Sequence, residues 1–152
     1  MEVRRTYLYK EHQKLGANLM AYSGWEMPIE YKGIKEEHNA VREKAGLFDV
    51  SHMGEVKVTG KQAEDFVQYL VTNDAKSLKD GKIFYAMMCY ENGGIVDDLL
   101  VYKYNDDDFL LVINAANVEK DFDWMISVKE KGKFDISPVS YTHLTLPTNR
   151  EV

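Results

Sequence analysis

Two adjacent carboxylates, Asp97 and Asp98, lie within a stretch that otherwise has the apolar character of a β-strand. Side chains alternate between the two faces of a strand, so these carboxylates must point to opposite sides of the sheet. An unpaired buried carboxylate is costly, and the inward one is expected to be paired, hydrogen-bonded or next to a polar ligand cavity. The alternative is that both lie in water at a strand end near a turn.

A β-hairpin is predicted to hold these two carboxylates. The Asn-Gly-Gly segment at 92–94 is typical of a tight turn, since glycine can take positive φ, and the flanking apolar residues predict strands over 83–90 and 95–104. A polar turn at 105–108 leads into 109–113, whose continuous apolar character predicts a strand buried on both faces.

Other elements are expected to pack against this hairpin. Val56 and Val58 alternate with polar residues, which predicts a strand with one solvated side. Apolar spacings of three, four and seven predict a helix over 33–45 with one face to the core, and two more helices are predicted after Gly60 and after a capping Asn117. The expected core residues are Ala63, Phe66, Val67, Leu70 and Val71 in the second helix and Val118, Phe122, Met125 and Ile126 in the third. Phe134, Ile136 and Val139 are expected to form one more strand. The fold class is therefore α+β, with antiparallel β-hairpins packed with helices.

Length and charge limit the classes of protein that fit. The chain has 152 residues and a formal net charge of −6, so nothing in its electrostatics favours nucleic acid or an anionic membrane as a partner. The N-terminus lacks the apolar core of a signal peptide, and no apolar run approaches the length of a membrane span. The single Cys89 excludes an internal disulfide, and an intracellular, cytoplasmic protein is expected.

Several common kinds of catalytic site are disfavoured. Asp49, Ser51 and His52 are close in sequence, but a hydrolytic triad must meet in space and no Gly-x-Ser-x-Gly turn is present. The four histidines lack the spacing of metal ligands, and 106–108 lacks the glycine and distal glutamate of a calcium loop, so no metal is expected. Phosphate-binding glycine motifs are also absent from the sequence.

The last twelve residues differ in character from the rest. Segment 141–152 continues no helix or strand pattern, and Pro147 with its polar neighbours disfavours one. We therefore expect a domain over 1–140 followed by a tail that is unrelated to the fold, with an artefact of the terminus as one explanation.

Several short motifs occur in a fixed order along the chain. They are Gly-Trp-Glu-Met-Pro at 24–28, Val-Arg at 41–42 with Gly-Leu-Phe-Asp-Val-Ser-His-Met-Gly at 46–54, Thr-Asn-Asp at 72–74, Gly-Gly-Ile-Val-Asp-Asp-Leu at 93–99, and Asn-Ala-Ala-Asn at 114–117 with Lys-Asp at 120–121. Over about 6–140 the chain resembles the T protein of the glycine cleavage system. That resemblance implies the folate-binding T-protein fold and a tetrahydrofolate-dependent aminomethyltransferase.

The resemblance also implies site residues. The essential carboxylate of the family is the second acid of its Gly-Gly-x-x-Asp-Asp motif, which is Asp98 here, and the implied folate pocket is formed by Met53, Tyr85, Asp98, Tyr102, Val112 and Asn114. Asp98 and Tyr102 are four apart on one predicted strand, and Val112 and Asn114 are two apart near the next, so each pair should share a face. Asp98 is expected to orient the reduced folate and stabilise positive charge on nitrogen, whereas Asp97→Asn should be tolerated.

The implied reaction needs a partner and a co-substrate. The family takes an aminomethyl group from the lipoyl arm of H protein, releases ammonia and leaves 5,10-methylenetetrahydrofolate. T proteins continue well past this point, so the chain is expected to hold an incomplete pocket and to lack full activity alone. Three alternatives stay open, namely a folate-dependent demethylase, a non-catalytic folate-binding factor of the same fold, and a purely structural fragment.

Overall fold

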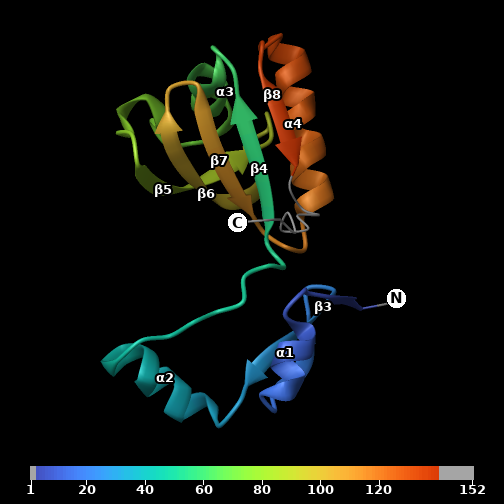
Figure 1. The fold of residues 1–152 in the computed structure, drawn as a ribbon. Coiled ribbons are helices and arrows are strands. Elements are labelled where there is room, and N and C mark those ends of the chain that lie inside the picture. The colour runs from blue at the N-terminus through green and yellow to red at the C-terminus, as the bar shows by residue number, and fades with distance from the viewer. Residues whose placement is uncertain (1–2, 141–152) are drawn as a thin grey trace, which may run out of the picture. The chain divides into compact units, whose positions relative to one another are not determined.

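The computed structural model of the protein describes residues 3–140 and divides into two compact units, Met1–His52 and Met53–Val152. Each unit has its own sheet, drawn in Figure 1. The expected tail at 141–152 lies outside the described residues. Among the residues that the structure describes, no helix is long and apolar enough to cross a membrane.

The first unit contains a three-stranded sheet in the order β1-β3-β2. Its elements are β1 (Arg4–Arg5), α1 (Tyr9–Lys14), β2 (Asn18–Tyr22), β3 (Trp25–Glu30) and α2 (Ile34–Glu43). A tight turn joins β2 to β3, and both of its residues, Ser23 and Gly24, have positive φ. β1 pairs in parallel with β3, whereas β2 pairs with it in antiparallel fashion.

The helix predicted over 33–45 exists as α2, but the expectation that one of its faces is in the core is wrong. No residue of α2 is buried, and Ile34 is 63% exposed. The small sheet of this unit covers too little of the helix to bury a full face. The start of α2 is instead held by Glu37, whose carboxylate accepts the backbone N–H groups of Tyr31 and Lys32 at 2.7 Å each.

Buried His12 ties α1 to the loop after α2. Its Nε2 lies 2.8 Å from Asp49 Oδ2, and its Nδ1 lies 2.7 Å from the Tyr31 hydroxyl. Burial alone would raise the pKa of Asp49, but hydrogen bonds with Ser51, His12 and Thr6 outweigh burial and lower the pKa to about 2. Asp49 thus holds this loop in place.

The second unit is built on a five-stranded sheet in the order β5-β6-β7-β4-β8, and every neighbouring pair is antiparallel. Its strands are β4 (Gly54–Thr59), β5 (Lys82–Cys89), β6 (Ile95–Asn105), β7 (Asp108–Ile113) and β8 (Ser137–Ser140). The predicted hairpin is confirmed, with Gly93 at φ 82° in the turn between β5 and β6. The predicted strand around Val56 and Val58 is β4, and both valines are fully buried.

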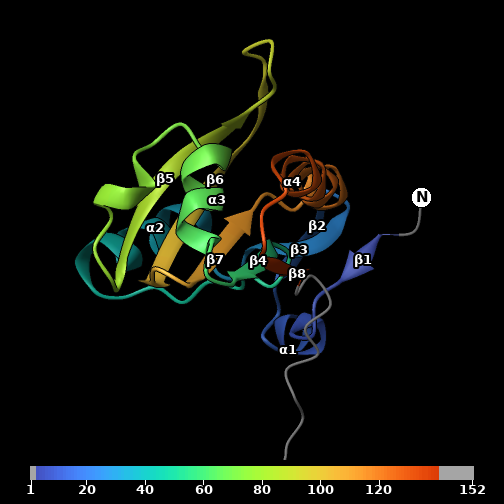
Figure 2. The same ribbon diagram turned by 90° about the horizontal axis from the view of Figure 1, so that it is seen from above.

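Two helices, α3 (Ala63–Leu70) and α4 (Val118–Gly132), pack on one face of this sheet, as the views in Figures 1 and 2 show, and a short 3-10 helix, η1 (Ala75–Ser77), follows α3. The predicted core residues of α3 are confirmed, since all five are buried. Side chains from both helices and from the inward positions of four strands form the core. Its fully buried members include Val56, Val58, Phe66, Val67, Val101, Phe109, Leu111, Ile113 and Met125.

Two details of this core differ from expectation. β7 is not buried on both faces, because its alternate residues Leu110 and Val112 are only half-buried, while the helices cover the other face. The buried residues of α4 are Asp121, Met125 and Val128 rather than the predicted set, of which only Met125 is fully buried. An acid therefore occupies an inward position of α4.

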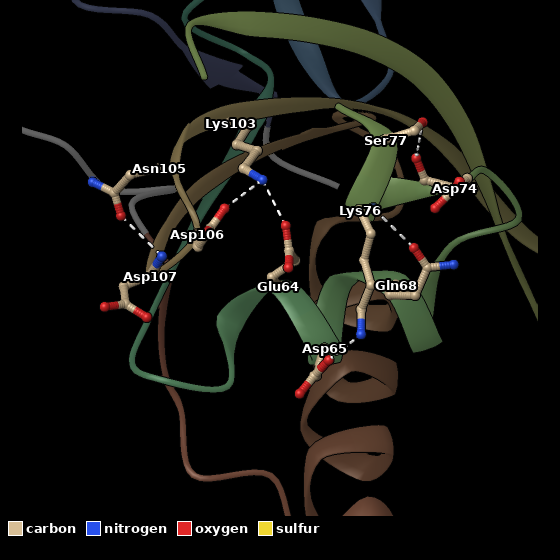
Figure 3. A network of polar contacts seen from close by, with 10 residues as sticks. All are labelled: Glu64, Asp65, Gln68, Asp74, Lys76, Ser77, Lys103, Asn105, Asp106 and Asp107. Atoms are coloured by element: carbon tan, nitrogen blue, oxygen red, sulfur yellow. Dashed lines mark hydrogen bonds and ion pairs between the residues drawn. The ribbon is translucent and has the colours of Figure 1, made fainter. Parts of the chain in front are cut away.

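A buried lysine lies on the inner face near the end of β6 (Figure 3). Lys103 is 4% exposed, and its Nζ lies 2.6 Å from both Glu64 Oε1 and Asp106 Oδ1. Burial alone would lower the pKa of Lys103, but the hydrogen bonds to Asp106 and Glu64 outweigh it and raise the pKa. This cluster joins α3, β6 and the following turn through opposite charges.

Candidate functional site

Most of the site residues implied by the sequence lie on the face of the sheet opposite α3 and α4. Alternation places Asp98 and Tyr102 on the same face of β6, as predicted, because inward residues separate them. Tyr85 on β5 pairs with Leu100, and Leu100 in turn pairs with Val112 on β7. Tyr85, Asp98, Tyr102 and Val112 are therefore neighbours on one surface of three adjacent strands.

The Asp98 carboxylate has a defined orientation because it is hydrogen-bonded to Tyr85. The Tyr85 hydroxyl donates to Asp98 Oδ2 across the β5–β6 pair. This hydrogen bond, with a smaller effect of burial and the charges of Asp98 and Asp97, raises the pKa of Tyr85, so the phenol remains a donor at neutral pH. Asp98 is half-buried, and Tyr85 is 61% exposed. A polar group can therefore reach this pair from solvent.

Asn114 does not follow the alternation expected for it. β7 ends at Ile113, and the amide Nδ2 of Asn114 donates to Asp97 Oδ1 at 3.1 Å and to the backbone oxygen of Asp98 at 3.0 Å. Asp97 belongs to the opposite face, so the expectation that Asn114 and Val112 share a face is wrong. The physical reason is that strand periodicity no longer applies once the backbone has left the sheet. Asn114 instead links both carboxylate residues of β6.

Met53 lies at the same end of the sheet as Asp98. It is half-buried and directly precedes Gly54, which pairs with Ile113 at the end of β7. A Cβ at position 54 would come within 2.6 Å of a Val118 side-chain atom and 2.7 Å of one of Ile113. A side chain at position 54 would therefore force Val118 and Ile113 to shift, and glycine avoids this.

Asp97 faces inward and is paired with a second acid. Asp97 is 7% exposed and Asp121, in the first turn of α4, is 0% exposed. Burial, the hydrogen bond to Asp97 and the Asp97 charge raise the pKa of Asp121 to about 8, with an opposing effect of Lys120. Burial would raise the pKa of Asp97 as well, but hydrogen bonds with Asp121, Asn114 and Asn117 outweigh it and lower that pKa. At neutral pH the two carboxyl groups thus share one negative charge and one proton.

Sequence reasoning missed Asp121 as a partner of the site, although the chain carries a signal for it. Asp121 lies three residues after Val118 and four before Met125, which is the spacing of the apolar stripe of a helix. A charged residue in that stripe must be buried and needs a partner. Asn117, predicted to cap α4, makes no side-chain cap hydrogen bond and interacts instead with Asp97.

The chemistry of this surface suits an uncharged or cationic planar ligand with polar edges. Tyr102 and Val112 share this face with one oriented carboxylate, and a neutral phenol donates to that carboxylate. An oriented carboxylate can accept a hydrogen bond or stabilise a nearby positive charge. Within residues 3–140, no group of three or more His, Cys, Asp and Glu side chains is placed to hold a metal ion.

The fold and these residues agree with the family to which the chain belongs. Residues 8–148 match the model of the GCVT N-terminal domain, so the chain is a member of that family, and the resemblance to T protein inferred from the motifs is confirmed. The mixed α+β fold is confirmed as well, since it matches the crystal structure of glycine cleavage system aminomethyltransferase T from Bartonella henselae with a TM-score of 0.85 at 36% identity.

Two relatives named aminomethyltransferase are more similar still. The protein from Desulfitobacterium hafniense (strain Y51) is 56% identical over 136 residues, and that from Alkaliphilus oremlandii (strain OhILAs) is 52% identical over 139 residues. These alignments cover 90% and 91% of this chain but 37% of each relative, and the Bartonella alignment covers 91% of this chain and 38% of that chain. The chain therefore spans well under half the length of these proteins.

Proposed function

We propose that this chain forms the N-terminal part of the folate site in a tetrahydrofolate-dependent aminomethyltransferase of the glycine cleavage system. The substrates would be tetrahydrofolate and the aminomethyl group carried on the lipoyl arm of H protein. Transfer would release ammonia, leave 5,10-methylenetetrahydrofolate and return the lipoyl group in its dithiol form. The bacterial relatives support a cytoplasmic location.

The observation that carries this proposal is the Tyr85–Asp98 hydrogen bond on an accessible sheet face of a chain from this family. A carboxylate in this position would orient the pterin and stabilise the positive charge that develops on N5 as it attacks the methylene carbon. Tyr102 and Val112 would supply apolar contact to the planar rings, and Met53 and Asn114 would border the same region. Positioning and electrostatics would then provide catalysis without a covalent enzyme intermediate.

Calorimetric titration of the purified 152-residue chain with tetrahydrofolate, under anaerobic conditions, tests the binding part of the proposal. We expect saturable binding that is weakened about tenfold by Tyr85→Phe, because the variant loses the hydrogen bond that orients Asp98. Tyr69→Phe is the matched control, since Tyr69 is an exposed tyrosine on α3. Equal affinity of the wild-type and Tyr85→Phe chains, or no binding by the wild type, would contradict the proposed site.

A turnover assay tests the role of Asp98. The chain is supplied with tetrahydrofolate and with H protein that carries the aminomethyl-lipoyl group, and release of ammonia is followed. Wherever the wild type turns over, Asp98→Asn should reduce the rate about 100-fold or more and weaken folate binding far less, because its charge acts mainly in the transition state. Asp107→Asn, in the exposed turn after β6, is the control. A rate for Asp98→Asn near that of the wild type would exclude this role.

The same assay separates the alternative functions of this fold. Ammonia release that depends on H protein supports aminomethyl transfer. Tetrahydrofolate binding without turnover on any donor supports a folate-binding factor, and turnover of an N-methyl donor instead of H protein supports a demethylase.

A further inference from the structure

The Asp97–Asp121 pair lies on the inner face of the sheet, next to Asp98 on the outer face, and takes no part in the proposed reaction. Asp97 is the residue before the proposed catalytic carboxylate, and Asp121 comes from a different element, the first turn of α4. Both side chains are more than nine-tenths buried. Two like-charged groups brought together in a core require an explanation, since apolar side chains of similar size would fill the same space.

The hydrogen bonds of Asp97 and Asp121 indicate that the two carboxyl groups bond to each other. Among the described residues, Asp97 Oδ2 and both carboxyl oxygens of Asp121 are buried and find no N–H or O–H donor. The nearest cation, Lys120 Nζ, is 3.7 Å from Asp121 Oδ1 and donates instead to the backbone oxygen of Val96 at 2.5 Å. A proton held between Asp97 and Asp121 gives one oxygen of each carboxyl group a hydrogen-bond partner.

One of the two acids is fixed to the site residues themselves. Asp97 Oδ1 accepts the amide of Asn114, and the same amide nitrogen donates to the backbone oxygen of Asp98. A single amide therefore joins the buried carboxylate to the backbone of the proposed catalytic residue. Asp97 accepts this amide, and its other hydrogen-bond partners are Asp121 and Asn117, both at the start of α4.

Lys120 adds a second connection between the same elements. Its hydrogen bond to the Val96 backbone oxygen ties the first turn of α4 to the start of β6, one residue before Asp97. The start of α4 is thus joined to two successive residues of β6, Val96 and Asp97, and Asn114 in the preceding loop bonds to the backbone of Asp98. These contacts fix the segment of β6 that presents the Asp98 carboxylate to the outer face.

We propose that Asp97 and Asp121 form a proton-sharing positioning pair that holds Asn114 and the Asp98 backbone in the geometry needed for folate binding. The inference rests on the proposed function for its ligand, but its structural part concerns this chain alone. The pair touches neither the outer face nor a ligand on it, and so acts through Asn114 and Asp98. A donor at position 121, rather than a charge, is what the pair requires.

Two substitutions at one position test this requirement. Asp121→Leu fills the same space without a donor, whereas Asp121→Asn keeps an amide that can donate to Asp97. Calorimetry with tetrahydrofolate should show about tenfold weaker binding for Asp121→Leu and near wild-type affinity for Asp121→Asn. Asp123→Asn, an exposed acid on the same helix, is the control and should match the wild type. Midpoints of thermal unfolding for all four chains show whether a loss of affinity reflects a loss of fold.

A second measurement on the free chain makes the inference independent of the proposed function. The side-chain amide of Asn114 is observed by ¹H–¹⁵N NMR in the same chains. Its signals should shift and exchange faster in Asp121→Leu and return close to the wild-type position in Asp121→Asn.

The outcomes are distinct. Weaker binding with a displaced Asn114 signal in Asp121→Leu, both restored in Asp121→Asn, supports the positioning pair. Unchanged Asn114 signals in Asp121→Leu, or an Asp121→Asn chain as impaired as Asp121→Leu, would overturn it. If the wild-type chain binds no tetrahydrofolate, the proposed function fails for this chain, and the Asn114 signals alone decide whether the pair positions the site.

Discussion

The inner face of the five-stranded sheet carries buried charge near both ends of β6, and the buried group is a cation at one end and a carboxylate at the other. Near the end of the strand, Lys103 is neutralised by Glu64 and Asp106. Near its start, Asp97 lies against a second acid, Asp121, with Lys120 only at the edge. The first cluster pairs opposite charges, and the second needs a bound proton to exist at neutral pH.

This difference separates two uses of buried polar groups. A buried cation with two anions within hydrogen-bond distance offsets much of its desolvation cost and joins three elements of the fold. A carboxyl group that must stay protonated well above its ordinary pKa makes the folded state less stable at neutral pH. The first arrangement favours stability, whereas the second opposes it and occurs next to the proposed catalytic residue.

Neutralising the acids of the Lys103 cluster should have the largest effect on stability. The double variant Glu64→Gln with Asp106→Asn leaves a buried ammonium group without an anion, and the free energy of unfolding should fall by about 3 kcal/mol. Urea denaturation measures this, and Lys76→Gln, which removes an exposed ion pair with Asp65, is a control with little expected effect. Stability equal to the wild type would show that the two clusters do not differ as described.

The opposite cluster should respond in the opposite direction. At pH 7 the folded state holds a proton on Asp121 that the unfolded chain does not hold, and Asp121→Asn removes the cost of that proton while keeping a donor. We expect the free energy of unfolding to rise by about 1 to 2 kcal/mol at pH 7, measured by the same denaturation. A destabilised Asp121→Asn chain would contradict the assignment of the proton to this pair.

The pH dependence sharpens this second prediction. Because the pKa of Asp121 is raised from 3.8 to about 8 on folding, its stabilising contribution is complete below about pH 4 and is lost as the pH rises to about 8. Asp97 has a lowered pKa, so it stabilises the folded state at neutral pH. This stabilisation is lost only as the pH falls below the ordinary pKa of an aspartate. The groups facing this pair are Asn114, Asn117 and Lys120.

The difference in stability between Asp121→Asn and the wild type should therefore grow from pH 5 to pH 8, with a slope of at most about 1.4 kcal/mol per pH unit. Asp123→Asn should show a constant difference over the same range.

The sequence predicted the elements that are covered by the core better than those that are exposed. The strands β4, β5, β6 and β7 and the helix α3 follow from apolar periodicity and turn residues, because one side of each is covered by core. The three-stranded sheet of the first unit was not predicted, since most of β2 is exposed and its sequence carries no clear alternation. The apolar spacing of α2 predicted a helix correctly, but it also predicted a core-facing side, and no residue of α2 is buried.

The candidate site was only partly visible in the sequence. Strand alternation placed Asp98 and Tyr102 together, whereas the Tyr85–Asp98 hydrogen bond depends on the register between strands, which no local pattern specifies. The Asp97–Asp121 pair joins residues 24 positions apart through tertiary packing. Asn114 was assigned to the wrong face because strand alternation was extended one residue past Ile113, where β7 ends.

The smallest expected effect concerns Asp97, whose substitution by Asn is predicted from the sequence to be harmless. The structure adds a condition to this prediction, since Asp97 faces away from the proposed site but is buried and accepts a hydrogen bond from Asn114. An asparagine at position 97 can still accept a hydrogen bond from Asn114 and donate one to Asp121. Asp97→Leu can do neither, although it fills the same space.

Titration with tetrahydrofolate should therefore separate the two variants of Asp97. We expect affinity within about twofold of the wild type for Asp97→Asn and a loss of up to about tenfold for Asp97→Leu, because only the leucine releases the amide that holds the Asp98 backbone. The Lys103 cluster provides the contrasting case, since Lys103→Met should alter stability and leave affinity unchanged. If Asp97→Leu and Lys103→Met affect affinity equally, the cluster beside Asp98 is only a part of the core, and the distinction between the two ends of β6 fails.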